Sequence, residues 1–485
     1  MSNLSELIPA GGGQNNFTFT ASGNISNGNA VGINSNGTVS VASNFTSQFG
    51  STTVYESAAS YGNKAVYDPD SQKVVFIYQD GGNSSYPTSV VGTVSGSTIS
   101  FGTPTVISSN SIYQQNSITY DENAQRVVAA YRHSASSSDL MVVAGQVSGT
   151  AVTWGTPVTA YTGNSSSFPN VTYDKNAQKV LMIASPYPTG GSGRVVSLSG
   201  STITLGTSAT FNANNTSQYM SVSYSDDTQS SLIAFQDYGN SSYGTFVVAT
   251  ISGTSVSFGT KTVFSSVNAS YDFSTVYDAS AKKVIVSYGQ SGAKVVAATP
   301  VGTDVAFGSV VSLDSEATAS AQSAVAYDSA NEKIAVAYYV GNPVRYFVKT
   351  ATVSGLTITP DDGRTEVPAT GSGYGYVQVN AMTYDSNAGK IVAAYADSGN
   401  SNYGTGAVFT VGNLDKKFMG LAGQAISDGA TGTINTPGAI NESQSGLTIG
   451  SDYYVQSDGS LSTTTSNVKV GKAITATTIN MKNRS

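Results

Sequence analysis

The stretch YDENAQRVVAAYRH, residues 120–133, recurs along the chain at a nearly constant interval. Six related stretches begin with the same residue type, at Tyr67, Tyr173, Tyr224, Tyr277, Tyr327 and Tyr384. Consecutive starts lie 50 to 57 residues apart, close to the roughly 40 to 50 residues of a four-stranded propeller blade. We therefore predict an all-β fold organised around a seven-bladed β-propeller.

Within each unit the position eleven residues after the opening tyrosine is mostly aromatic, which indicates a hairpin of fixed length. The residues at this position are Tyr78, Tyr131, Ala184, Phe235, Tyr288, Tyr338 and Tyr395. In the second unit, the pattern predicts four strands over residues 116–120, 126–132, 140–147 and 151–161. A Ser-Gly turn joins the last two, because glycine supplies the positive φ that a short hairpin needs.

The seventh unit ends after three strands, whereas one unmatched strand precedes the first unit. That early strand starts with the aromatic-Gly pair Phe49-Gly50, which recurs as Phe101-Gly102, Trp154-Gly155, Phe258-Gly259 and Phe307-Gly308. We predict that it completes the seventh blade, because closing the ring leaves no unpaired sheet edge at the seam. The fourth strand of the sixth blade, within residues 356–367, is degenerate.

Both regions flanking the repeats are rich in β-forming residues but do not match the blades. The predicted organisation is a propeller over residues 45–411, inserted into one small β-sandwich or barrel module built from residues 1–44 and 412–485. Residues 1–14 read as a mobile arm. Two separate small domains are the alternative, although 44 residues alone bury little apolar surface.

Composition limits the function classes. The chain has 51 glycines, 29 tyrosines and only 11% charged residues, which suits short strands and tight turns, and no segment has a helical period. A net charge of −7 argues against a nucleic-acid partner. Cysteine is absent and histidine occurs once, so we expect no metal site and no cofactor. The N-terminal segment does not resemble a signal peptide, and no apolar run is long enough for membrane insertion.

One loop motif is a candidate glycan-binding site, because aromatic rings stack on sugars while carboxylates and amides bond to their hydroxyls. It follows the second strand of three blades, and its residues are Asp80, Asn83 and Tyr86, then Asp237, Asn240 and Tyr243, then Asp397, Asn400 and Tyr403. The alternative is structural: aspartate begins an Asx-type turn, asparagine and glycine adopt left-handed backbone, and tyrosine packs between blades.

Other conspicuous residues are interpreted as structural. The aspartates after the repeat tyrosines, such as Asp121, fit hairpin turns. His133 is expected on the surface, and Trp154 is expected to pack within the blade. The six arginines, Arg126, Arg132, Arg194, Arg345, Arg364 and Arg484, occupy no common repeat position, so no sialidase-like arginine triad is predicted and no catalytic residue is assigned.

Residues 21–42 (ASGNISNGNAVGINSNGTVSVA), together with residues 418–481, resemble a small β-module common in virion proteins of tailed bacteriophages, of capsid-decoration and tail-fibre type. The blade motifs VGTVSGSTISFGTP (residues 91–104) and DYGNSSYGT (residues 237–245) are similar to repeat proteins of marine phages. The resemblance implies a virion-surface protein, made in the host cytoplasm and incorporated into the particle.

From the repeats, the lack of a catalytic constellation and this resemblance we expect a non-enzymatic protein. Its terminal module would bind other virion proteins of the capsid or tail, in a homo-oligomer, and its propeller would present a surface for host glycan or for protection. Two alternatives stay open: a glycan-degrading depolymerase of the tail, which needs a pair of carboxylates in a cleft, and a purely structural decoration protein without ligand.

Overall fold

The structure is a computed structural model that describes residues 15–34, 36–134, 138–163, 168–213, 216–268, 273–314, 323–340, 345–369, 381–456, 458–466 and 468–481. The N-terminal arm expected over residues 1–14 lies outside the described residues. The chain divides into two compact units. Unit 1 comprises Met1–Ser47, Asp361–Gly363 and Gly412–Ser485, and unit 2 comprises Gln48–Pro360 and Arg364–Val411.

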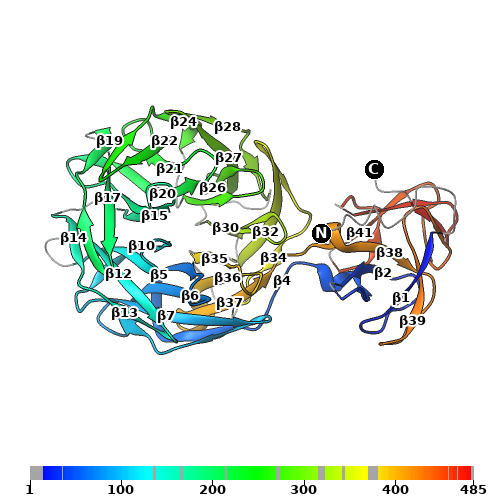
Figure 1. Ribbon diagram of the computed structural model, residues 1–485. Coiled ribbons are helices and arrows are strands. Elements are labelled where there is room, and N and C mark those ends of the chain that lie inside the picture. Colours follow the sequence, from blue (N-terminus) through cyan, green and yellow to red (C-terminus); the bar gives the residue numbers. More distant parts are fainter. Residues whose placement is uncertain are drawn as a thin grey trace. The chain divides into compact units, whose positions relative to one another are not determined.

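Unit 2 is a seven-bladed β-propeller, as the repeats predict (Figure 1). Blades two to six are separate antiparallel sheets of five strands, and blades one and seven share a nine-stranded sheet. The innermost strands of blades two to seven are β10 (Ile112–Asp121), β15 (Asn170–Asp174), β20 (Ser217–Ser225), β25 (Ser274–Asp278), β30 (Ala324–Asp328) and β35 (Ala381–Asp385). Figure 1 shows several of them around the centre of the ring.

The second and third strands of each blade form its buried middle. The second strands are β6 (Lys73–Asp80), β11 (Arg126–His133), β16 (Lys179–Ala184), β21 (Ser230–Asp237), β26 (Lys283–Gly289), β31 (Lys333–Val340) and β36 (Lys390–Asp397). The third strands are β7 (Tyr86–Ser95), β12 (Leu140–Ser148), β17 (Gly190–Ser199), β22 (Tyr243–Ser252), β27 (Ala293–Val301), β32 (Arg345–Ser354) and β37 (Tyr403–Thr410). Their side chains pack between neighbouring blades, as Val295 and Val336 do.

The fourth, outermost strand of each blade is interrupted, although the sequence predicted one continuous strand. It consists of the pairs β8 (Thr98–Phe101) and β9 (Thr105–Val106), β13 (Ala151–Trp154) and β14 (Val158–Tyr161), β18 (Thr202–Leu205) and β19 (Ala209–Ala213), β23 (Ser255–Phe258) and β24 (Thr262–Asn268), β28 (Asp304–Phe307) and β29 (Val311–Ser312), β33 (Thr357–Pro360) and β34 (Thr365–Glu366). In blades one and two the break contains Pro104 or Pro157, which lacks an N–H for the ladder.

The ring is closed by the N-terminal strand, as predicted. β4 (Gln48–Phe49) pairs with β37 through Phe49 opposite Phe409. β5 (Thr53–Asp68) then crosses from one blade to the next: its first part pairs with β37 and its second part with β6. One strand therefore completes blade seven and begins blade one, and the chain enters and leaves the ring on adjacent strands.

Two repeated contacts explain why the sequence pattern is so constant. The first is the glycine of the aromatic-Gly pair. A Cβ at Gly102 would lie 2.0 Å from the carbonyl oxygen of Thr150, in the outer hairpin of the next blade, and a Cβ at Gly50 would lie 1.7 Å from that of Ser97. Only glycine permits this close approach. Gly50 makes the contact between blades seven and one, at the seam where the ring closes.

The second repeated contact is a tyrosine hydroxyl that reaches the preceding blade. The opening tyrosine of the repeat contacts the first hairpin turn there: Tyr224 accepts from the N–H of Asn176 at 3.1 Å, and Tyr277 from that of Asp227 at 3.2 Å. The tyrosine eleven positions later reaches the end of the preceding outer strand, as Tyr338 does by donating to Asp314 at 2.9 Å. Both tyrosines therefore join blades rather than line a site.

Unit 1 consists of two five-stranded sheets. One contains β1 (Asn16–Thr20), β2 (Ala30–Ile33), β3 (Val39–Val41), β38 (Phe418–Ala422) and β39 (Thr431–Asn435). The other contains β40 (Ile440–Asn441), β41 (Asp452–Val455), β42 (Leu461–Ser462), β43 (Lys469–Ala473) and β44 (Ile479–Met481). Apolar residues of both sheets share one buried cluster, which includes Phe418 and Ile479, and the buried amide of Asn441 donates to Asn435 at 2.6 Å.

Among the described residues, helical structure occurs only as single turns, which the sequence did not predict. They are η2 (Ala42–Phe45), η3 (Ser398–Asn400) and α1 (Leu414–Lys417). Within the described ranges, none of these is long and apolar enough to span a membrane.

Candidate functional site

The aspartates of the three predicted glycan-binding loops face into their own turns. Asp80 is nearly buried, and its Oδ1 accepts from the backbone N–H of Gly82 at 2.9 Å and of Asn83 at 3.1 Å. The Oδ1 of Asp237 accepts from Gly239 at 3.2 Å, and that of Asp397 accepts from Gly399 at 3.1 Å. These carboxylate oxygens hold the turn, in the arrangement that the structural alternative described.

The left-handed backbone in these loops falls on other residues than expected. Ser84 and Ser85 have φ of 54° and 59°, and Ser241 and Ser242 repeat those values, whereas the asparagine was assigned this role. The asparagine instead ends the turn with its carbonyl, which accepts from the N–H of the loop tyrosine: Asn83 from Tyr86 and Asn240 from Tyr243, both at 3.0 Å.

The fold brings two of the three loops together. In blade seven Ser401 and Asn402 carry the positive φ after Asn400, and half-buried Tyr403 starts β37. The carbonyl of Asn402 accepts from Ser60 at 3.0 Å, while the N–H of Gly81 in blade one donates to Ala59 at 2.8 Å. The loops of blades seven and one thus flank β5 at the seam. The Asp237 loop lies in blade four, in a separate sheet.

The seam contains an acidic residue that the sequence analysis missed. Glu56 of β5 accepts from the hydroxyl of Tyr78 at 3.0 Å and from the N–H of Ala58 at 3.1 Å. Burial raises the pKa of the Glu56 carboxyl, and the negative charge of Asp80 raises it further. A usable signal existed: Glu56 follows Gly50 by six residues, as Asp314 follows Gly308, and both accept from a tyrosine of the next blade.

In blade four the loop aspartate pairs with a cation. Lys261 donates to Asp237 Oδ2 and to Asn212 Oδ1, both at 2.9 Å. The side-chain amide of Asn212 in turn donates to Asp237 Oδ1 at 3.1 Å. Asp237 is 1% exposed, so this carboxylate is held inside a polar network. Its role at this loop is to fix the end of β21 rather than to offer a free acceptor.

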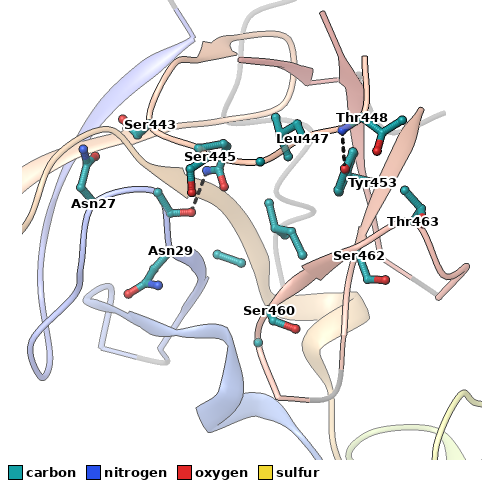
Figure 2. A pocket seen from close by; sticks show the side chains of 16 residues that line it. Asn27, Asn29, Ser443, Ser445, Leu447, Thr448, Tyr453, Ser460, Ser462 and Thr463 are labelled. Atoms are coloured by element: carbon teal, nitrogen blue, oxygen red, sulfur yellow. Dashed lines mark hydrogen bonds between the residues drawn. The ribbon is translucent and has the colours of Figure 1, made fainter. Parts of the chain in front are cut away.

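Unit 1 contains a polar hollow of about 500 Å³ (Figure 2). It is lined by residues 27–30, 443–448 and 459–463 and by Tyr453, none of which carries a charge. The side chain of Gln444 donates to the carbonyl of Gly28 at 2.9 Å, and the N–H of Thr448 donates to the hydroxyl of Tyr453 at 2.9 Å. Its hydroxyls, amides and backbone groups suit a neutral polar ligand or a backbone segment of a partner.

The remaining sequence interpretations have mixed outcomes. The turn aspartates are structural, since Asp121 Oδ1 accepts from the N–H of Ala124 at 2.8 Å. Trp154 packs against Gly145 and donates to Ser89 at 2.9 Å. The surface position expected for His133 is wrong: the residue is 9% exposed at the end of β11, where burial lowers the pKa of its imidazole. Among the described residues, no cluster of three or more His, Asp or Glu could hold a metal.

No protein-family model matches the sequence, and no curated protein matches it. Solved structures resemble the fold. One is a protein provisionally assigned as a 6-phosphogluconolactonase from Bacteroides uniformis, with 13% identity, covering 77% of this chain and 98% of its own, at a TM-score of 0.48. Another is a triple arginine-to-alanine mutant of AofleA from Arthrobotrys oligospora, with 10% identity, covering 69% and 94%, at a TM-score of 0.41. At these values the likeness carries no conclusion about activity.

Proposed function

We propose that this chain is a non-catalytic surface protein of a tailed-phage virion, in which the terminal module binds other virion proteins and the propeller is displayed for contact with host glycan. The observation that carries the proposal is the insertion of the ring into a module made from both chain ends. Gln48 and Thr410, which connect the ring to that module, are paired neighbours in one sheet. The ring is therefore joined to that module by two adjacent chain crossings, at Gln48 and at Thr410.

The module itself supports an attachment role. Strands from both chain ends share its core, so the ring could be added or lost without dismantling it. The resemblance of residues 21–42 and 418–481 to phage virion modules points the same way. The uncharged hollow beside Tyr453 provides a surface where a backbone segment of a neighbouring virion protein can bond.

The face around the seam is the part of the propeller best suited to a ligand. Two of the motif loops meet there, and their half-buried tyrosines, Tyr86 and Tyr403, stand on rigid strands. Since the carboxylates of Asp80 and Asp397 are used by their turns, contact with sugar would rest on the tyrosines and on asparagine side chains rather than on a carboxylate.

Localisation tests the proposal directly. Antibodies raised against the full chain should label intact particles of the phage that encodes it, and labelled full chain should bind host cells and compete with adsorption. Absence of the chain from purified particles would refute the virion assignment. Labelled particles without any cell or glycan binding would instead identify a decoration protein that has no ligand.

A second function is favoured by one observation, the pair Glu56 and Asp80. An acid whose pKa is raised by burial, beside a second carboxylate, is what a glycan-cleaving depolymerase uses as its general acid. Release of oligosaccharides from host polysaccharide by the full chain, and its loss in Glu56→Gln, would establish this rival. Under the proposed function the chain releases none.

A further inference from the structure

Blade two ends its second strand differently from blades one and four. Those two strands end in Gln-Asp, at Gln79-Asp80 and Gln236-Asp237, whereas β11 ends in Arg132-His133. The glutamine amides are bonded: Gln79 donates to the carbonyl of Ile112, and Gln236 donates to Asn268 at 3.0 Å. A neutral amide therefore completes the fold at this position, and the propeller does not need a cation there.

Arg132 is a buried cation without a counter-ion. The residue is 8% exposed, Nη1 donates to the side-chain oxygen of Gln115 at 3.0 Å, and the guanidinium lies 4.2 Å from the ring centroid of Tyr113. Nε is buried without an acceptor, and within the described part of the chain no carboxylate pairs with this arginine.

Arg364 in blade six shows one way in which this fold neutralises such a group. It lies 4.1 Å above the ring of Phe347 and also forms an ion pair with Asp314. Burial lowers the pKa of Arg132, yet a guanidinium stays protonated at working pH. A buried charge without a partner is unfavourable for folding, and residues that lower stability in this way are typical of functional sites.

The surroundings of Arg132 define the class of ligand. A guanidinium binds carboxylate and sulfate oxygens through its planar set of N–H donors. Tyr113 is 40% exposed and presents an aromatic ring of the kind that packs on sugars. The amide of Gln115 supplies further donors for hydroxyl groups. We propose that Arg132, Tyr113 and Gln115 bind an acidic saccharide, with its carboxylate or sulfate on the guanidinium. This inference rests on the proposed function, which supplies the premise that the propeller contacts host glycan, and it specifies the class of that glycan.

The test is binding of defined oligosaccharides to the full chain at physiological salt, by calorimetry and by the shift of the unfolding midpoint. The probes are oligogalacturonate for a carboxylate, a sulfated galactan oligosaccharide for a sulfate, a neutral galacto-oligosaccharide, and inorganic sulfate. We expect at least one acidic sugar to bind and stabilise the protein, while the neutral sugar and free sulfate bind far more weakly.

The decisive variant is Arg132→Gln, because glutamine is the residue that blades one and four use here. It should weaken binding about ten- to a hundredfold, as expected for lost bonds to a charged group, and should leave the midpoint of the free protein equal or higher. The matched control is Arg194→Gln. Arg194 also lies over a tyrosine, 4.6 Å from the ring centroid of Tyr161, and its Nε is likewise buried without an acceptor. It differs from Arg132 in being less buried and in donating to the carbonyl of Ala160 at 2.6 Å.

Three results would overturn the inference: no binding of either acidic sugar, an equal loss of affinity in both arginine variants, or a clearly lower midpoint for free Arg132→Gln. Equal binding of inorganic sulfate would reduce the site to a simple anion site and overturn the saccharide assignment. Failure here is distinguishable from failure of the proposed function, because particle labelling does not depend on Arg132, and host-cell binding by the Arg132→Gln chain would then rest on the loops at the seam.

Discussion

Replacement of Gly50 by alanine tests the closure of the ring at its seam. The new Cβ would lie 1.7 Å from the carbonyl oxygen of Ser97. Since a relaxed C···O contact is about 3.3 to 3.6 Å, the strands must separate by roughly 1.5 Å. Overpacking of this kind costs about 1–3 kcal/mol, offset by about 0.4–1 kcal/mol from the stiffer unfolded chain. We expect a net loss of about 1–2 kcal/mol.

Two matched glycines separate this effect from that of a generic substitution. At Gly155 a Cβ would lie 3.1 Å from the oxygen of Ser201, so Gly155→Ala should change stability by less than about 0.5 kcal/mol. At Gly102 a Cβ would lie 2.0 Å from the oxygen of Thr150, but this contact joins blades one and two, away from the seam. Gly102→Ala should therefore destabilise the protein without opening the seam.

Hydrogen exchange together with urea unfolding distinguishes these outcomes. Opening of the seam exposes residues 53–59 and 403–410, so in Gly50→Ala their amides should exchange about tenfold faster for each 1.4 kcal/mol lost. The same segments should be unchanged in the other two variants. Equal stability and equal exchange of Gly50→Ala and Gly155→Ala would mean that β4 does not pack against Ser97, and the closure described above would be wrong.

Three further outcomes follow from side-chain contacts. Tyr338→Phe removes the hydroxyl that donates to Asp314 and should lower the unfolding free energy by about 1–2 kcal/mol in urea titrations; no change would mean that the hydroxyl does not join the blades. Because burial lowers the pKa of His133, its contribution is complete above about pH 6.5 and is lost as pH falls through the folded-state pKa. Wild-type stability should decline in that window by at most about 1.4 kcal/mol per pH unit, and His133→Asn should remove this decline, as measured by denaturation at several pH values. Asp237→Ala should cost about 1–3 kcal/mol more than Asp80→Ala, because it also leaves a lysine without its buried acceptor; equal losses would show that the network in blade four contributes nothing.

The blades could be predicted from the sequence because each repeated residue makes the same contact at successive blade boundaries. The tyrosine of each first strand must reach the preceding turn, as Tyr224 reaches Asn176, so neither its spacing nor its identity can drift far. The closure could be predicted for the same reason: Phe49-Gly50 carries the outer-strand pattern, although it lies outside the repeats.

The site residues were harder to predict, since their environment depends on neighbours from different blades. A motif such as Asp80 to Tyr86 indicates a turn but not which way its carboxylate points. His133 occupies the position of Asp80 and Asp237 in the repeat, yet its burial could not be inferred from spacing. The sequence showed only that Arg132 and the other arginines share no common position in the repeat. The lack of a counter-ion at Arg132 depends on its neighbours in three dimensions.

The degenerate outer strand of blade six follows from the way the ring is closed. At six boundaries the outer-strand glycine faces the hairpin turn of the next blade, from Gly50 on Ser97 to Gly308 on Leu356. Blade six faces blade seven, whose third strand ends at Thr410 and has no outer hairpin, because its fourth strand comes from the N-terminus. Within the described residues of blade seven, no outer hairpin supplies a turn carbonyl for this pair, so the constraint on the pair is absent. Pro360 takes the aromatic position, opposite Ala351, and Asp361 takes that of the glycine. A ring closed by a C-terminal hairpin would have required glycine there, so this degenerate outer strand is itself evidence for closure by the N-terminal strand.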